Sequence, residues 1–418
     1  MNVLMMTNTF TPFVGGVARS VTAFTDELRK MGHRVVVVAP EFEGAPESER
    51  DVIRVPAIQH FNGSDFSLVL PVPGYLSARL EEFKPDIVHS HHPHLLGGTA
   101  VRIASRFECP LVFTYHTMYE HYLHYVPAHA KRLHQFVVNL VTGYCNLCDH
   151  VIAPSRSVAD VIRARGVEVP IDIVPTGVHT ERFEHGDGRT FRQLRGIPEQ
   201  AFVAGYVGRL APEKNLTFLA EAVGRFVTRT ANGHFLVVGS GPSGQNMREI
   251  FDRQGNSDRL HLVGSLEGQA LIDAYHAMDV FAFASHTETQ GIVLLEAMAA
   301  GRPVVAIDAA GAREVVRDRQ NGRLIRAEDR RAFAEALEGM AQATHEERTA
   351  YRQAARATAA RFTMARSAQR LVEVYERVLA REGRESKDES AWGGAIEEIK
   401  AEWELLKNIA EAASQTFR

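Results

Sequence analysis

Two glutamates, Glu288 and Glu296, flank the start of a strongly apolar segment that is predicted to form a helix over 292–300. A helix that is apolar on all sides belongs in the interior, and a carboxylate there needs a donor, a cation or a ligand. Gly291 lets the backbone approach a ligand, and the first amides of the helix can hold an anion. Hydroxyl acceptors beside an anion-binding helix end fit a nucleotide-sugar. The alternative is a structural helix whose glutamate pairs with an arginine.

Two cations, Arg209 and Lys214, lie on a second predicted turn, between a strand over 201–209 and a helix that begins near Leu216. The amino end of that helix already attracts phosphate. Arginine can bind a diphosphate through two hydrogen bonds, and lysine acts on it as a point charge. The pair therefore indicates a diphosphate site, with solvated surface charges as the alternative.

His116 follows the predicted strand 110–114, and ligands of open parallel sheets bind at the carboxyl ends of strands. We therefore expect His116 to be functional, although a single histidine can also be structural. Four further histidines surround another strand end: His89, His91, His92 and His94. No carboxylate or cysteine joins them, which argues against a metal site.

Several glycines lie at predicted strand ends. Gly15 and Gly16 follow the first strand, but their spacing lacks the GxGxxG pattern of a dinucleotide site. Their exposed amides could cover a bound ligand, or they could form a plain tight turn. Gly239 and Gly241 make a similar turn after the strand 234–238, near a ligand or as a simple bend, and Gly264 follows the strand 260–263.

The segment 118–134 alternates tyrosines with histidines and other basic residues. Such a mixture suits a membrane interface or a sugar-lipid acceptor. An amphipathic helix packed on the sheet is an equal alternative. The candidate acceptor-binding residues are Tyr119, His121, Tyr122, His124 and Tyr125.

Short apolar runs alternate with helical segments along the chain, which predicts two α/β domains with parallel sheets. We expect a Rossmann-like domain over 1–182 and a second over 183–361, since 182–198 is mostly polar and rich in glycine. A closing helix over 362–380 is expected to pack back on the first domain. A flexible linker and an amphipathic helix, whose apolar stripe lies within 395–412, make up 381–418.

Composition limits the classes of protein. The 418 residues, 45% of them hydrophobic, suffice for two cores, and a net charge of -4 gives no reason to expect nucleic-acid binding. Three cysteines cannot build a disulfide framework, and Cys145 and Cys148 lie in an apolar, helical context. With no signal peptide or membrane-spanning run, we expect a cytoplasmic protein, with the inner face of the membrane as an alternative location.

The ordered motifs resemble those of glycosyltransferase family 4, the retaining enzymes with the GT-B fold, over about residues 1–379. The motifs are Gly15-Gly16, Tyr115-His116-Thr117, Val207-Gly208-Arg209 with Lys214-Asn215, Val237–Gly241, and Glu288 with Glu296. The resemblance implies two Rossmann-like domains facing an interdomain cleft. It also implies transfer of a hexose from a donor of the UDP-glucose or GDP-mannose type to a lipid or glycan hydroxyl.

The resemblance assigns roles to single residues. Arg209 and Lys214 would stabilise the leaving diphosphate, and Glu296 would accept from the ribose hydroxyls. Glu288 and His116 would contact the sugar. The remaining donor-binding residues would be Gly15, Gly16, Gly239, Gly264, Thr289, Gln290, Gly291, Ile292 and Val293. The chain contains no D-x-D motif, which agrees with an enzyme that needs neither metal nor cofactor.

The loop His116–Glu120 followed by His124-Tyr125 is similar to that of the diacylglycerol glucosyltransferases. Two alternatives stay open: a mannosyltransferase that acts on a phosphoinositide or polysaccharide, and a non-catalytic protein that binds sugar nucleotides. The sequence does not indicate the oligomeric state.

Overall fold

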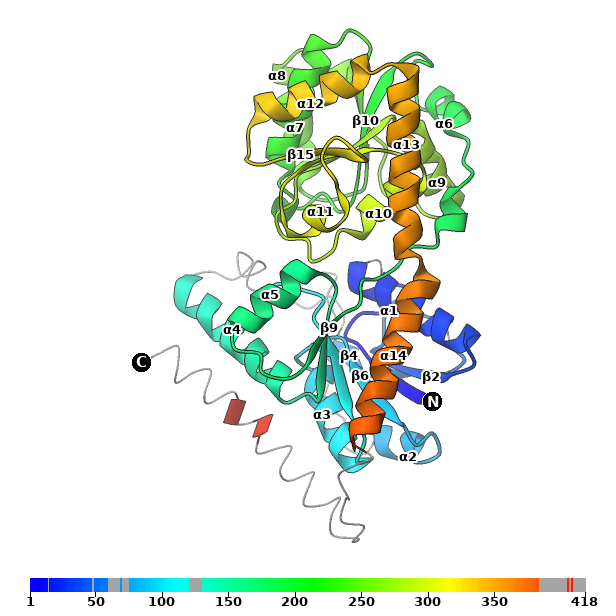
Figure 1. The fold of residues 1–418 in the computed structure, drawn as a ribbon, viewed down its shortest axis with the longest axis vertical. Coiled ribbons are helices and arrows are strands. Elements are labelled where there is room, and N and C mark those ends of the chain that lie inside the picture. The colour runs from blue at the N-terminus through cyan, green and yellow to red at the C-terminus, as the bar shows by residue number, and fades with distance from the viewer. Residues whose placement is uncertain are drawn as a thin grey trace. The chain divides into compact units, whose positions relative to one another are not determined.

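The computed structural model describes residues 1–13, 15–46, 49–58, 68–69, 75–119 and 130–382, with 404, 405, 407 and 408 of the tail. The chain folds into two compact units, Met1–Thr176 with Met364–Arg418, and Gly177–Thr363 (Figure 1). Each unit contains one parallel sheet covered by helices, which confirms the expected pair of Rossmann-like domains.

The first unit contains a seven-stranded sheet in the order β3-β2-β1-β6-β7-β8-β9. Its central strands are short apolar runs that are buried on both faces, as helices on both sides of a parallel sheet require. The strands are β1 (Asn2–Met6), β2 (Arg34–Pro40), β3 (Val52–Val55), β6 (Ile87–Ser90), β7 (Leu111–Thr114), β8 (His150–Ala153) and β9 (Ile171–Ile173). A separate antiparallel pair consists of β4 (Ala57–Ile58) and β5 (Leu68–Val69). The helices are α1 (Gly16–Lys30), α2 (Tyr75–Glu81), α3 (Leu96–Arg106), α4 (Ala130–Asn146) and α5 (Arg156–Ala164).

Helix α14 (Met364–Glu382) belongs to the first unit although it follows the second in sequence. Its buried residues recur at the three- and four-residue spacing of one helix face: Ala368, Leu371, Val372, Tyr375 and Val378. This face shares a core cluster with Val21 and Phe24 of α1. The Tyr375 hydroxyl lies 2.6 Å from His89 Nδ1 of β6.

The second unit contains a six-stranded parallel sheet in the order β12-β11-β10-β13-β14-β15. The strands are β10 (Phe202–Val207), β11 (Gly233–Val238), β12 (Leu260–Leu262), β13 (Val280–Phe283), β14 (Val304–Ile307) and β15 (Gly322–Ile325). The helices are α6 (Gly188–Leu194), α7 (Leu216–Arg229), α8 (Ser243–Arg253), α9 (Gly268–Ala277), α10 (Ile292–Ala299), α11 (Ala310–Val315), α12 (Arg330–Gln342) and α13 (His345–Ala359). Short 3-10 turns are η3 (Thr180–Phe183), η4 (Pro212–Lys214), η5 (Ser257–Arg259) and η6 (Ala360–Phe362).

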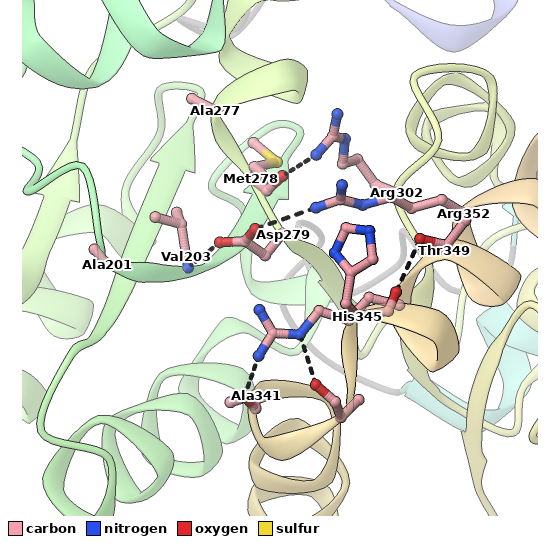
Figure 2. Close-up of polar contacts among 12 residues, drawn as sticks. Ala201, Val203, Ala277, Met278, Asp279, Arg302, Ala341, His345, Thr349 and Arg352 are labelled. Carbon is pink, nitrogen blue, oxygen red and sulfur yellow. Dashed lines mark hydrogen bonds and ion pairs between the residues drawn. The ribbon is translucent and has the colours of Figure 1, made fainter.

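Two arginines, Arg192 and Arg352, pair with Asp279 at the amino-terminal edge of the second sheet, and Figure 2 shows Arg352 beside this carboxylate. Asp279 Oδ2 accepts from the Val203 amide and from Arg192 Nη2, both at 2.9 Å, and Arg352 Nη2 lies 3.7 Å from Oδ1. Buried Arg302 donates to the Met278 carbonyl oxygen at 2.7 Å. The cluster thus ties the starts of the paired strands β10 and β13 together.

Parts of the tail and of the acceptor segment lie outside the described residues. In the tail, Leu405 packs against the first unit's core and Asn408 Nδ2 donates to the Leu140 carbonyl at 3.2 Å. Most of the expected helix over 395–412 is not described, nor are His121, Tyr122, His124 and Tyr125. Among the described helices, none is long and apolar enough to cross a membrane.

Candidate active site

The polar loops predicted to bind the donor leave the carboxyl-terminal edge of the second sheet on either side of its switch point. Strands β10 and β13 are neighbours in the sheet, while the strands that follow each of them lie on opposite sides. In open α/β sheets, ligands bind at this reversal of strand order. The loops after β10 and β13 carry Arg209, Lys214, Glu288 and the start of α10.

Ion pairs hold the two predicted cations. The Lys214 ammonium bonds to the Glu288 carboxylate and so joins the loop after β10 to the loop after β13. Arg209 pairs with Glu213, whose side chain is only 2% exposed. The Glu213 carbonyl also accepts from Thr287 Oγ1 at 3.2 Å, which adds a second tie between the loops.

Sequence reasoning did not single out Glu213. The signal was present, since a carboxylate four residues after Arg209 in a short 3-10 turn can reach back to the guanidinium. Its near-complete burial identifies it as the residue that orients Arg209. Asn215 follows with a left-handed backbone, φ 55°, and begins helix α7.

Gly291, whose left-handed backbone has φ 73°, directly precedes helix α10 at this site. Gly291 has no side chain with which to cap the helix, and the first amides of a helix favour an anion. Those amides include Ile292 and Val293, preceded by Thr289 and by buried Gln290. Gly311 packs behind the loop, since a Cβ there would come within 2.7 Å of Glu288 Cβ.

Glu296 is 7% exposed and accepts a 2.7 Å hydrogen bond from the Tyr275 hydroxyl at Oε2. Tyr275 lies fully buried on α9. We expected the burial of the Glu296 carboxylate to cost free energy, and the neutral Tyr275 hydroxyl offsets that cost by a hydrogen bond. Sequence reasoning did not find Tyr275, because its distance from Glu296 along the chain follows no local pattern.

Two glycines of the second unit allow its loops to approach closely. Gly239 donates to the Gly264 carbonyl at 2.8 Å, and both residues have a positive φ. A Cβ on Gly239 would lie 1.9 Å from the Gly208 carbonyl oxygen. These loops, which follow β10, β11 and β12, therefore meet at backbone distance.

In the first unit, the loops after β1, β6 and β7 leave the same edge of the sheet. Gly15 precedes helix α1 and Gly16 begins it. His116 follows β7, and its Nε2 lies 2.9 Å from His91 Nδ1. Tyr119 is described and partly buried, with its ring 5.9 Å from that of His94.

Buried histidines gather around His116. Burial lowers the pKa of His89, His92 and His116 to about 3, and holds the pKa of His91 well below its ordinary value. These rings are therefore neutral near pH 7. Within the described residues, no group of three or more His, Cys, Asp or Glu side chains is arranged to hold a metal ion.

The sequence matches two family profiles, described as Glycosyltransferase Family 4 over residues 14–182 and Glycosyl transferases group 1 over residues 201–343. One relative, the alpha-monoglucosyldiacylglycerol synthase of Acholeplasma laidlawii, is 30% identical over 326 residues, or 73% of this chain and 80% of the relative. The GDP-mannose-dependent alpha-mannosyltransferase of Mycolicibacterium smegmatis is 30% identical over 408 residues, or 91% of this chain and 98% of the relative.

Solved structures share the fold. Sucrose-phosphate synthase from Thermosynechococcus elongatus has a TM-score of 0.72 at 20% identity, with 91% of this chain and 99% of that chain covered. Anabaena HepE in complex with UDP and glucose has a TM-score of 0.71 at 20% identity, with 90% and 99% covered.

Two parallel-sheet units with polar loops at their strand ends, together with these likenesses, define a glycosyltransferase of the GT-B fold. Within that class, the chain belongs to glycosyltransferase family 4.

Proposed function

We propose that this glycosyltransferase transfers a hexose, with retention of configuration, from a nucleoside diphosphate to a lipid hydroxyl, with diacylglycerol as the acceptor. The observation that carries the proposal is that Arg209, Lys214, Glu288 and the start of α10 lie on the two loops at one switch point, where the Lys214–Glu288 ion pair joins these loops. The Acholeplasma relative, an alpha-monoglucosyldiacylglycerol synthase, supports the choice of acceptor.

The charges of the site suit a diphosphate that leaves during the reaction. Two cations and the amides of α10 surround the position proposed for the phosphates, and they stabilise negative charge as it develops. Glu213 and Glu288 pair with the two cations, so the charges of these four side chains balance. The phosphates of the donor would therefore interact with cations that are already paired with carboxylates.

The other proposed contacts are made to separate parts of the donor. Buried Glu296 accepts from the ribose hydroxyls, and Glu288 with the amides near Gly291 holds the sugar. His116 contributes a hydrogen bond to the transferred sugar from the first domain. No residue of the site is a clear nucleophile, so we propose front-side attack assisted by the leaving phosphate.

A lipid acceptor requires contact with a membrane surface. The aromatic and basic segment 118–134 has the composition for this contact, because tyrosine rings and cationic groups favour the interfacial layer. We propose peripheral association through this segment.

The proposal is tested by incubating purified protein with UDP-glucose or GDP-mannose and with diacylglycerol in mixed detergent micelles. We expect a hexosyl-diacylglycerol whose anomeric configuration matches that of the donor, read by mass spectrometry and NMR. Lys214→Ala should lose this activity, and Arg331→Ala, which removes an exposed cation on α12, should keep it. Failure to consume either donor, or a parental rate for Lys214→Ala, would overturn the proposal.

A mannosyltransferase is the second candidate, because the Mycolicibacterium relative, named GDP-mannose-dependent, aligns with 91% of this chain. A thermal-shift panel of UDP, GDP and ADP separates the two, since a ligand that binds only the folded state raises its stability. Stabilisation by UDP alone supports the glucosyl donor, and stabilisation by GDP alone supports the mannosyl donor.

A further inference from the structure

His91 and His116 are joined through their ring nitrogens. His91 Nδ1 lies 2.9 Å from His116 Nε2, the ring centroids are 5.2 Å apart, and the ring planes are inclined by 28°. The distance between the ring centroids is close to the sum of the nitrogen–nitrogen distance and the distance from centroid to nitrogen within each ring. The two nitrogens therefore lie nearly on the line that joins the centroids. The shared proton therefore lies near both ring planes, as a good hydrogen bond requires.

Both rings are neutral, because burial lowers the pKa of each, and the neighbouring histidines lower the pKa of His91 further. A neutral imidazole has one N–H donor and one acceptor nitrogen. One ring must therefore donate and the other accept, and the direction decides which nitrogen of His116 retains its lone pair.

Met5 sets that direction. The other nitrogen of His91, Nε2, lies 3.2 Å from the buried Met5 sulfur. A thioether can only accept a hydrogen bond. His91 Nε2 therefore carries the proton, His91 Nδ1 accepts, and His116 Nε2 donates to it. In this tautomer, His116 Nδ1 holds the lone pair.

His89 keeps the plane of His91 in place. The His89 ring lies against the His91 ring, with centroids 4.2 Å apart and planes inclined by 34°. His89 is itself fixed at both nitrogens, by Thr114 Oγ1 at 2.7 Å and by the Tyr375 hydroxyl at 2.6 Å. The sheet and α14 thus hold the ring that supports His91.

We propose that His91 is a positioning residue that fixes His116 as the Nε2–H tautomer, so that His116 Nδ1 accepts a hydrogen bond from a hydroxyl of the transferred sugar. This inference rests on the proposed function for the role of His116. The tautomer itself does not depend on any substrate.

The direct test is long-range proton–nitrogen NMR of the full chain labelled with [15N]histidine, without substrate. The His116 signals are assigned by their loss in His116→Gln. We expect a protonated Nε2 and an unprotonated Nδ1. A protonated Nδ1 on His116 would overturn the proposal whatever the activity.

Variants then separate positioning from packing. His91→Asn can place an amide oxygen near the position of Nδ1 and should retain the His116 tautomer. His91→Leu removes the acceptor, and we expect a changed His116 spectrum with a roughly tenfold loss of kcat/KM for the donor, the effect of about one lost hydrogen bond. Rescue by asparagine is the readout that a merely structural role would not give.

The matched control is His92→Asn. His92 is buried beside His91 and accepts from the Asn8 amide at 3.1 Å, but its ring does not bond to His116. We expect this variant to alter stability and to leave the His116 tautomer unchanged. If His91→Leu keeps both the parental spectrum and the parental kcat/KM, the positioning role is wrong. If the parent transfers no sugar while the expected tautomer is present, the proposed function fails instead.

Discussion

Glu296 differs from the other carboxylates of the candidate site in its hydrogen-bond partner. Its carboxylate accepts a hydrogen bond from the neutral Tyr275 hydroxyl, whereas Glu288 and Glu213 each pair with a cation. Among these three carboxylates, Glu296 therefore combines burial with a neutral partner. This difference agrees with its proposed role as the acceptor of neutral ribose hydroxyls.

We expect Glu296→Gln to weaken binding of the nucleoside diphosphate by roughly 10-fold to 100-fold, because hydrogen bonds to a charged acceptor contribute about 1.5–3 kcal/mol. Tyr275→Phe should cost less, since it removes only the group that orients Glu296. Isothermal titration with the preferred nucleotide measures both affinities. Equal losses in the two variants would contradict the assigned roles, and unchanged thermal unfolding would show that the fold is retained.

The buried histidines predict a loss of stability in acid. The folded-state pKa of His89, His92 and His116 is about 3, below the ordinary value of 6.5. Between these values the unfolded chain binds more protons, so the stability is complete above pH 6.5 and falls as the pH drops towards 3. Each histidine contributes a slope of at most about 1.4 kcal/mol per pH unit.

Urea unfolding of the parent chain at pH 7 and pH 5 measures this effect, and we expect the midpoint to be lower at pH 5. His89→Gln should reduce the difference between the two midpoints, because one titrating group is gone. An equal midpoint at both pH values in the parent would refute the expected dependence.

Among the elements, the central strands were predicted well because each is a short apolar run bounded by polar residues. The predicted strands over 110–114, 201–209 and 234–238 correspond to β7, β10 and β11. The edge strands β3 and β15 were not predicted, although the edge strand β12 was. Gly322 also weakens the strand pattern of β15. A glycine fits at this position, because a Cβ there would lie 2.0 Å from the Val304 carbonyl oxygen.

The carboxyl-terminal edge of the second sheet was predicted in outline, since Arg209, Lys214, Glu288 and Glu296 all lie on elements at that edge. The sequence did not predict that Arg209 pairs with Glu213 or that Glu296 pairs with Tyr275. Such pairs depend on which strands become neighbours, and no local sequence pattern predicts the strand order. The opposite edge was missed for the same reason, because Asp279, Arg192 and Arg352 are far apart in sequence.

At that opposite edge, we expect Asp279→Asn to lower the free energy of unfolding by about 3 kcal/mol, because arginines would then face one another without a counter-charge. Glu335→Gln breaks an exposed ion pair with Arg331 and should change stability by less than about 1 kcal/mol. Urea denaturation of both variants gives the comparison. A change of similar size in both would show that the Asp279 cluster does not stabilise the second unit.

On the scale of the whole molecule, the first unit is made from two separate parts of the chain, Met1–Thr176 and α14. The compact units divide at Thr176, earlier than the composition at 182–183 indicated, because Gly177–Phe183 packs with the second unit. The Val178 amide bonds to the Phe362 carbonyl at 2.8 Å, and Phe183 lies in the second unit's core. Loop composition marks where a boundary lies only approximately.

We expect Leu371→Ala on α14 to destabilise the first unit by about 2–5 kcal/mol, since it removes a buried side chain that is 1% exposed. Gln369→Ala, an exposed change on the same helix, should have almost no effect. Thermal unfolding followed by calorimetry measures both. The assignment of α14 to the first unit's core would be wrong if the two variants unfolded alike.

The late position of α14 has a consequence for synthesis. A ribosome makes β1, α1 and the rest of the first sheet well before the helix that covers Val21 and Phe24. Until residue 364 and those after it leave the exit tunnel, this apolar surface of the nascent chain is uncovered, and such surfaces are prone to aggregate. We therefore expect newly made chains to need chaperone protection throughout translation of the entire second unit, Gly177–Thr363.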